Sequence, residues 1–245
     1  MHIDYASLFL SLQSQKNEME TRLIQFLSGF VTAERLSLFN KILSLRTNYL
    51  TVVLEDIYQT QNTSAVVRTA DCFGIQNVHV IENKNAFQVN PDVVRGASNW
   101  ITLNRYNESE MNTTSALRKL RQDGYRIVLA SPHDHDVNLE SFDLTKGKAA
   151  IVFGCERPGL SEYANREADE FMKIPMVGFT ESLNVSVSAA ITLHHLTHKL
   201  RNHTDIDWHL TDQEKQKILL DWLRVSIKRV DLLEEKFQEL NNTEK

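Results

Sequence analysis

The sequence predicts an α/β fold in which a mainly parallel sheet is covered by helices on both faces. Between residues 50 and 200, short apolar runs expected as strands alternate with helical segments, an order typical of parallel sheets. With 245 residues and 42% hydrophobic content, the chain suits one domain with appended segments, or two small domains. Polar residues follow apolar runs at three distant places, and ligands of open α/β sheets bind where strands end.

The N-terminal segment, residues 1 to about 47, is expected to be helical because apolar residues recur at steps of three and four. Polar Arg35, Lys41 and Arg46 lie between or after these apolar positions. They fit either a solvated basic face of an amphipathic helix or an arm that contacts phosphates.

Six runs after this segment are expected as strands. They are residues 51–54, 78–81, 101–103, 125–130, 149–153 and 171–175. Helices are expected between some of them. One begins at a cap formed by Asn62 or Thr63 and ends at Gly74, and another begins at Thr113 or Thr114.

The apolar run 183–200 is expected as a helix capped by Ser182, followed by a polar stretch and a further C-terminal helix. The last helix carries an apolar stripe that must pack on its own domain or on a second subunit. The stripe consists of Leu219, Leu223, Ile227, Val230, Leu233, Phe237 and Leu240. We therefore divide the chain into residues 1–47, 48–202 and 203–245.

The composition restricts the partners and the location of the protein. The net charge is −5, so a nucleic acid would be held by local basic patches, or by patches summed across an oligomer. Cys72 and Cys155 are expected to be reduced, which fits a cytoplasmic location. No signal-peptide pattern and no apolar run of membrane-spanning length is found, so no membrane partner is expected.

The segment Gly154-Cys-Glu-Arg-Pro-Gly159 carries two glycines five residues apart after a predicted strand. A dinucleotide fingerprint requires glycine where Glu156 stands, and a P-loop requires Lys and Ser or Thr where Leu160 and Ser161 stand. An acidic turn between glycines suits a neutral or cationic ligand rich in hydroxyl groups. S-adenosylmethionine fits this description, and a plain strand-to-helix turn is the alternative.

Two further polar positions are candidates for ligand contacts. Arg68 lies on a mostly apolar predicted helix, where an unpaired guanidinium is costly to bury, so it either pairs with a carboxylate or binds an anionic substrate. Ser182 would leave free backbone amides at a helix N-terminus, which bind polar ligand groups, or it acts as a cap alone.

No metal site is expected. His194, His195 and His198 lie together on one predicted helix. The glutamate of the zinc-protease motif is absent from this cluster, because His195 occupies its place, and no third ligand is apparent.

Three segments together resemble the signature motifs of the SpoU branch of the SPOUT RNA 2′-O-ribose methyltransferases, over roughly residues 48–200. The segments are Asn62 with Arg68-Thr-Ala70, Phe153-Gly-Cys-Glu-Arg-Pro-Gly159, and Ile174-Pro-Met176 with Ser182-Leu-Asn-Val-Ser186. The flanking segments Leu50–Glu55 and Arg95-Gly-Ala97 with Trp100 are similar to the TrmH subgroup, which methylates guanosine in tRNA.

The resemblance implies a parallel sheet whose C-terminal part forms a trefoil knot, a homodimer, S-adenosylmethionine bound in the knot, and 2′-O-methylation of the D-loop guanosine of tRNA (Gm18). It also implies roles for individual residues. The catalytic set is Asn62, Arg68, Glu156, Ser182 and Asn184, the cofactor contacts are Gly154, Ile174, Met176 and Leu183, and the tRNA contacts are Arg46, Arg35 and Arg68.

The mechanism that follows assigns Arg68 to clamping a phosphate and stabilising the developing alkoxide, because a guanidinium stays protonated and is a poor base. Glu156 compensates the sulfonium charge or orients Arg68, and the proton acceptor is left unassigned. Three alternatives stay open: the same chemistry on 23S rRNA, a non-catalytic RNA-binding protein with this fold, and a dinucleotide-binding enzyme. Ribosomal relatives often carry a compact RNA-binding domain before the catalytic one, and the N-terminal segment is short for such a domain.

Overall fold

The computed structural model describes residues 5–131, 137–155 and 159–243. The chain divides into two compact units. One comprises residues 46–209, and the other comprises the residues up to 45 together with those from 210 onward. The two terminal segments therefore belong to one unit, which the sequence did not predict because nothing in either segment indicates that the other is its packing partner.

In the described part of residues 46–209, seven strands form one parallel sheet in the order β3-β2-β1-β6-β4-β7-β5. The strands are β1 (Leu50–Glu55), β2 (Asn77–Ile81), β3 (Thr102–Tyr106), β4 (Arg126–Ala130), β5 (Val137–Asn138), β6 (Ala149–Phe153) and β7 (Glu170–Lys173). The central pair is β1 and β6, in which Val53 lies opposite Val152. The predicted parallel sheet is confirmed, and the two-residue strand β5 was not predicted.

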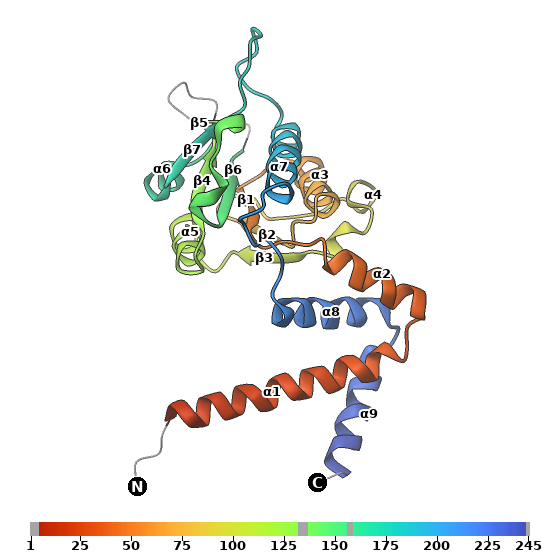
Figure 1. Cartoon of the computed structure of the whole chain (residues 1–245). Coiled ribbons are helices and arrows are strands. Elements are labelled where there is room, and N and C mark those ends of the chain that lie inside the picture. The colour runs from red at the N-terminus through yellow and green to blue at the C-terminus, as the bar shows by residue number, and fades with distance from the viewer. Residues whose placement is uncertain (1–4, 132–136, 156–158, 244–245) are drawn as a thin grey trace. The chain divides into compact units, whose positions relative to one another are not determined.

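Helices cover both faces of this sheet (Figure 1). They are α3 (Thr60–Cys72), α4 (Pro91–Val94), α5 (Thr113–Gln122), α6 (Glu162–Glu167) and α7 (Val185–Arg201), with short 3-10 turns at Ala97–Asn99, Leu139–Ser141 and Leu144–Lys146. Val52 and Leu54 of β1 pack in one core with α3 and α7, whereas Val53 packs in a second core with α5 and α6. Successive side chains of β1 are therefore buried on opposite faces of the sheet. Each buried Val or Leu contributes about 1.5–3 kcal/mol to the free energy of folding.

Three helices begin at residues other than those predicted. The N-cap of α3 is Gln59, so Asn62 lies in the first turn instead of capping it. The N-cap of α5 is Asn112, not Thr113 or Thr114. The N-cap of α7 is Asn184, whose side chain accepts a hydrogen bond from the Ser186 backbone, so the capping role predicted for Ser182 is wrong.

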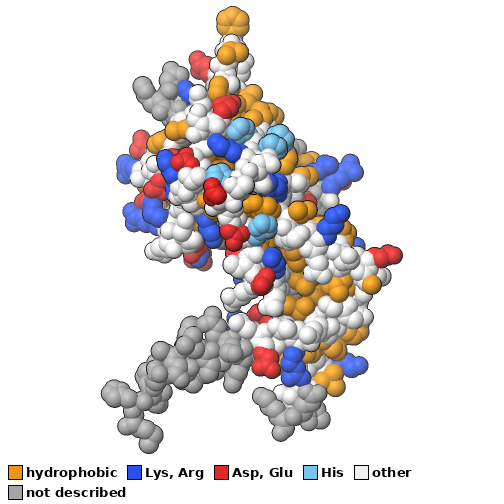
Figure 2. Space-filling view, in the orientation of Figure 1, with side chains coloured by type: hydrophobic (Ala, Val, Ile, Leu, Met, Phe, Trp, Pro, Cys, Tyr) orange, Lys and Arg blue, Asp and Glu red, His pale blue; other side chains and the backbone are white. Residues whose placement is uncertain are grey.

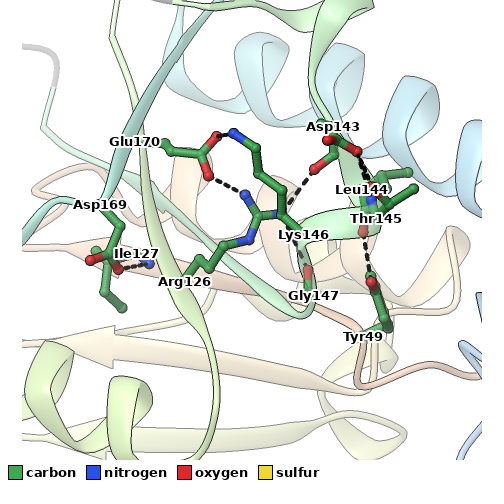
Figure 3. A network of polar contacts seen from close by, with 10 residues as sticks. All are labelled: Tyr49, Arg126, Ile127, Asp143, Leu144, Thr145, Lys146, Gly147, Asp169 and Glu170. Carbon is green, nitrogen blue, oxygen red and sulfur yellow. Dashed lines mark hydrogen bonds and ion pairs between the residues drawn. The ribbon is translucent and has the colours of Figure 1, made fainter.

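Charged side chains join the amino-terminal ends of β4 and β7 (Figure 3). Arg126, the first residue of β4, pairs with Glu170, the first residue of β7, and its guanidinium donates to the carbonyl oxygens of Asp143 and Gly147 at 3.0 and 3.2 Å. Lys146 Nζ lies 3.4 Å from Glu170 Oε2. These contacts hold β4 and β7 together at the end of the sheet where the strands begin. None of them involves the carboxyl ends of the two strands.

The second unit consists of α1 (Tyr5–Ser28), α2 (Ala33–Leu43), α8 (Asp212–Ser226) and α9 (Val230–Thr243). Each predicted helical segment is divided in two, after Ser28 and after Ser226, and Arg229 has a φ of 57° at the second break. The ring centroids of Phe26 and Phe237 are 5.4 Å apart, and those of Phe39 and Trp222 are 5.5 Å apart. Phe237 of the C-terminal apolar stripe thus packs against α1 of its own chain, whereas Leu240 at the end of the stripe is half exposed.

None of the helices in the described ranges is long and apolar enough to cross a membrane.

Candidate active site

The first and third sequence motifs meet where the N-termini of α3 and α7 come together. Asn184 Nδ2 donates a hydrogen bond to Asn62 Oδ1 at 3.1 Å, and Asn62 Nδ2 donates to Gln59 Oε1 at 3.0 Å. Asn184 Oδ1 accepts hydrogen bonds from the backbone and hydroxyl of Ser186 at 2.8 and 2.6 Å. Both amides therefore have fixed orientations, since each is used on its donor side and on its acceptor side.

A cavity of about 350 Å³ lies at the carboxyl ends of β4, β6 and β7. We call it the glycine-loop hollow, because Gly154 and Gly159 both line it. All four predicted cofactor contacts line it as well, together with Ser182; they are Gly154, Ile174, Met176 and Leu183. The position matches the end of a parallel sheet where ligands bind, and the volume is within the range of small-molecule sites.

The loop around Gly154 folds back on itself, and glycine is required there for space. A Cβ at residue 154 would lie 2.6 Å from the backbone nitrogen of Leu160 and 2.7 Å from the carbonyl carbon of Gly159. A β-bridge joins Cys155 to Gly159, which has a φ of 90°. The loop between the two glycines is thus closed at its base, and Glu156 within it lies outside the described residues.

A second cavity, of about 520 Å³, adjoins the first. We call it the asparagine hollow, because Asn62 and Asn184 line it. Its wall also includes Ser182 and Cys155, and both of these residues line the glycine-loop hollow too. Three of the predicted catalytic residues, Asn62, Ser182 and Asn184, therefore surround a space next to the predicted cofactor site.

Arg68 does not line either hollow. It is six residues after Asn62 on α3, about 9 Å along the helix and about 120° around it. Its side chain is exposed, and within the described ranges it forms neither a hydrogen bond nor an ion pair. The structure thus leaves the Arg68 guanidinium on the solvent side of α3, and its catalytic role stays a prediction.

The two other arginines predicted to hold RNA lie in different environments. Arg46 is 3% exposed, pairs with Asp71 and donates to the Ile75 carbonyl oxygen at 3.2 Å. Arg35 is exposed on α2, with its guanidinium 6.0 Å from the Phe39 ring centroid. The ion pair with Asp71 gives Arg46 a structural contact, whereas Arg35 is open to solvent, and the RNA contact of both arginines stays a prediction.

Several residues that sequence reasoning did not select also line the glycine-loop hollow. Lys173 supplies a cation directly before Ile174, and Ser131 and Asn165 supply neutral polar groups. Cys155 lines both hollows as a free thiol, and Cys72 is also free. The sequence signal for Lys173 and Ser131 was their place at or directly after the end of a predicted strand. Asn165 reaches the hollow from α6, and no sequence signal indicated it.

The lining of the glycine-loop hollow fits S-adenosylmethionine. Its apolar side chains Phe153, Met172 and Ile174 suit an adenine ring, and its exposed backbone at the glycines can approach a ribose closely. Among the described histidines, cysteines and carboxylates, no group of three or more is arranged to hold a metal ion.

The resemblance implied a parallel α/β sheet, and the structure has one, with a cavity at its strand ends that all four predicted cofactor contacts line. Residues 49–194 match the model of the SpoU rRNA Methylase family. The chain belongs to this family.

Relatives with a defined name are similar over most of their length. A tRNA (guanosine(18)-2′-O)-methyltransferase of Borreliella burgdorferi is 44% identical over 211 residues, which cover 86% of this chain and 94% of the relative. The enzyme of the same name from Thermus thermophilus is 31% identical over 79% of this chain and 97% of its own. The crystal structure of the Aquifex aeolicus TrmH/SpoU tRNA modifying enzyme superimposes with a TM-score of 0.69 at 25% identity, covering 80% of this chain and 98% of that one.

Proposed function

We propose that this protein transfers the methyl group of S-adenosylmethionine to a ribose 2′-hydroxyl in tRNA, at guanosine 18 of the D-loop. The observation that carries the proposal is the shared wall between the two hollows, where Ser182 and Cys155 face both the predicted cofactor site and the paired asparagines. The likeness to enzymes named for guanosine 18, at 44% identity over 86% of the chain, supports the choice of nucleotide.

The residues of the glycine-loop hollow bind the methyl donor. Backbone atoms at Gly154 and Leu183 and the apolar side chains of Ile174 and Met176 would hold it. S-adenosylmethionine would supply a methyl group on a cationic sulfur. The ribose 2′-oxygen would bond to this carbon as the carbon–sulfur bond breaks, and neutral S-adenosylhomocysteine would leave. Because the two hollows adjoin, a ribose held by the asparagines can present its hydroxyl to that methyl group without a large movement.

The fixed amides position the ribose. Asn62 and Asn184 hold one another and are held by Gln59 and Ser186, so their orientation requires no reorganisation when the substrate binds. Ser182 supplies a hydroxyl at the boundary of the hollows. Arg68 stays protonated and, exposed on α3, binds an RNA phosphate. It stabilises the developing alkoxide only if RNA binding brings its guanidinium to the asparagine hollow. The acceptor of the hydroxyl proton is not assigned.

We also propose that the protein is a homodimer. The α7 side chains Val187 and Ile191 are exposed at a four-residue step, and Leu183 continues the row before the helix starts. The loop between β7 and α7 projects from its unit (Figure 1) and carries hydrophobic side chains at its tip (Figure 2). Val177 and Phe179 of this loop are fully exposed. Such an apolar row beside the site suits a second copy of the chain better than a polyanion.

A trefoil knot in the C-terminal part of the sheet domain and a cytoplasmic location complete the proposal, together with RNA binding by the N-terminal helical segment. The knot is testable by threading analysis of a crystal structure. Sedimentation analysis tests the dimer, and a monomer at micromolar concentration would contradict it.

The decisive experiment is methylation of total RNA with labelled S-adenosylmethionine, followed by digestion and mass spectrometry. We expect label on the ribose of guanosine 18 in tRNA. Label in 23S rRNA instead of tRNA would show that ribosomal RNA is the substrate. A protein that binds RNA but does not bind S-adenosylmethionine in calorimetry would be a non-catalytic RNA-binding member of the family.

A further inference from the structure

Glu55, the last residue of β1, is a buried carboxylate that lines neither hollow. It is 2% exposed and stands at the carboxyl end of a strand otherwise composed of Leu, Val and Thr. A buried carboxylate is costly unless its oxygens accept hydrogen bonds, so a carboxylate at the end of β1 requires a structural explanation.

Three donors satisfy this carboxylate. Ser161 donates from its backbone nitrogen to Glu55 Oε2 at 3.0 Å and from its hydroxyl to Oε1 at 2.6 Å. The Thr113 hydroxyl donates to Oε1 at 2.6 Å and itself accepts from Asn83 Nδ2 at 2.9 Å. Two of the three bonds therefore go to one residue, 106 positions away in the sequence.

Ser161 lies two residues after Gly159, where the glycine loop (residues 154–159) leads into α6. Its hydroxyl caps α6 by accepting a hydrogen bond from the Ala164 backbone at 3.1 Å. The residue before it, Leu160, lines the glycine-loop hollow, and Asn165 of α6 lines it as well.

Close backbone packing at Gly154 links the position of Ser161 to the wall of the glycine-loop hollow. A Cβ at residue 154 would lie 2.6 Å from the Leu160 nitrogen, so the two backbone segments are already in close contact. A displacement of Ser161 would therefore displace Leu160 and Gly159 against Gly154, in the part of the loop that forms the cavity.

We propose that Glu55 is a positioning residue that holds Gly159 and Leu160, through Ser161, against Gly154 in the arrangement that binds the methyl donor. It sets the affinity for S-adenosylmethionine without touching the cofactor. This inference rests on the proposed function, because it takes the glycine-loop hollow as the cofactor site.

The test replaces Glu55 by Gln, which has nearly the same shape. A glutamine cannot accept all three hydrogen bonds, because its amide nitrogen must face either the Ser161 backbone N–H or the hydroxyls. We expect the dissociation constant for S-adenosylmethionine, measured by calorimetry, to rise about tenfold, as for the loss of one charge-assisted hydrogen bond. The KM for the cofactor should rise in parallel, while kcat at saturating cofactor changes less than about twofold.

The matched control is Thr113→Val. Thr113 is as buried as Glu55 and binds the same carboxylate oxygen, but it belongs to α5 and not to the glycine loop. If the contacts of Glu55 only support the fold in general, the two variants should both lower the unfolding temperature and should change the cofactor affinity by the same factor. The proposal requires that Thr113→Val lower the unfolding temperature and leave the cofactor affinity within about twofold of the wild type.

Ser161→Ala gives a second route to the same result if Glu55→Gln does not fold. It removes the hydroxyl contact and should weaken cofactor binding. The loss of affinity in the double variant, Glu55→Gln with Ser161→Ala, should be little larger than in the more affected single variant. Hydrogen exchange of the Ser161 amide in the unliganded protein, faster in Glu55→Gln, gives a readout independent of turnover.

The inference is overturned if Glu55→Gln and Ser161→Ala bind the cofactor as the wild type does, or if Thr113→Val loses as much affinity as they do. A wild-type protein that binds no S-adenosylmethionine overturns the proposed function, and this inference with it. Normal wild-type binding and methylation with unaffected variants overturns the inference alone.

Discussion

Asn184 donates a hydrogen bond to Asn62 at 3.1 Å although the two residues are 122 positions apart. The contact joins the caps and first turns of two helices, because Asn184 caps α7 and Asn62 lies in the first turn of α3. One side chain thus serves both the fold and the site, and the two roles can be separated by substitution.

Replacing Asn184 by Ala removes the cap and the contact with Asn62. We expect the free energy of unfolding to fall by about 1 kcal/mol from the lost cap and kcat to fall roughly 100-fold, the effect of one preorganised polar group. Urea unfolding and single-turnover methylation measure the two quantities. Asn184→Ser is the matched control, since serine also caps helices: it should recover stability and not activity. Recovery of both would remove the Asn62 contact from the mechanism.

Arg68→Ala should abolish methyl transfer without affecting the fold. The guanidinium is exposed, so the free energy of unfolding should change by less than about 0.5 kcal/mol, and calorimetry should give a cofactor affinity close to that of the wild type. Arg166, an exposed arginine on α6, provides the control, and Arg166→Ala should retain activity. An Arg68→Ala enzyme with normal turnover would refute the assigned role.

Gly154→Ala should disrupt the glycine loop, because the new methyl group would lie 2.6 Å from the Leu160 backbone nitrogen. We expect a loss of about 1–3 kcal/mol in the free energy of unfolding, as for overpacking, together with weakened cofactor binding. Gly178→Ala is the comparison, since the nearest atom to its added carbon is 4.0 Å away. Thermal unfolding and calorimetry of both variants check the prediction, and equal behaviour of the two would contradict it.

Arg46 has two possible roles that lead to different measurements. Its contacts with the partly exposed Asp71 and with the Ile75 carbonyl oxygen predict that Arg46→Ala lowers the free energy of unfolding by about 2 kcal/mol, as for the loss of a charge-assisted hydrogen bond. A contact with tRNA predicts instead a higher KM for tRNA in the folded protein. Asp71→Asn breaks the same pair without removing the arginine, so a raised KM in Arg46→Ala but not in Asp71→Asn would assign the arginine to RNA.

Burial lowers the pKa of His79 to about 4, with a smaller contribution from Lys119. The unfolded chain binds this proton below about pH 6.5 and the folded protein does not. Stability is therefore fully present above pH 6.5 and falls as the pH decreases toward 4, by about 3 kcal/mol in total. His79→Gln should flatten the pH dependence of the urea midpoint over this window; an unchanged slope would mean that another group causes it.

The sequence predicted the sheet well because its signals are local. Alternating strands and helices require only the apolar runs, and Gly74 ends α3 as its left-handed φ of 76° allows. Helix starts were less predictable, since Ser182 and Asn184 are both good capping residues and the contact with Asn62 favours the second. The burial of Arg46 and the role of Glu55 depend on partners at Asp71 and Ser161, which no local pattern indicates.

The ion pair of Arg126 with Glu170 and the cavity bounded by Gly154 stand at opposite ends of the same sheet. The two places share strands but no residue. Substitutions where the strands begin can therefore be used to tune the stability of this domain while every side chain that lines the cavity is kept.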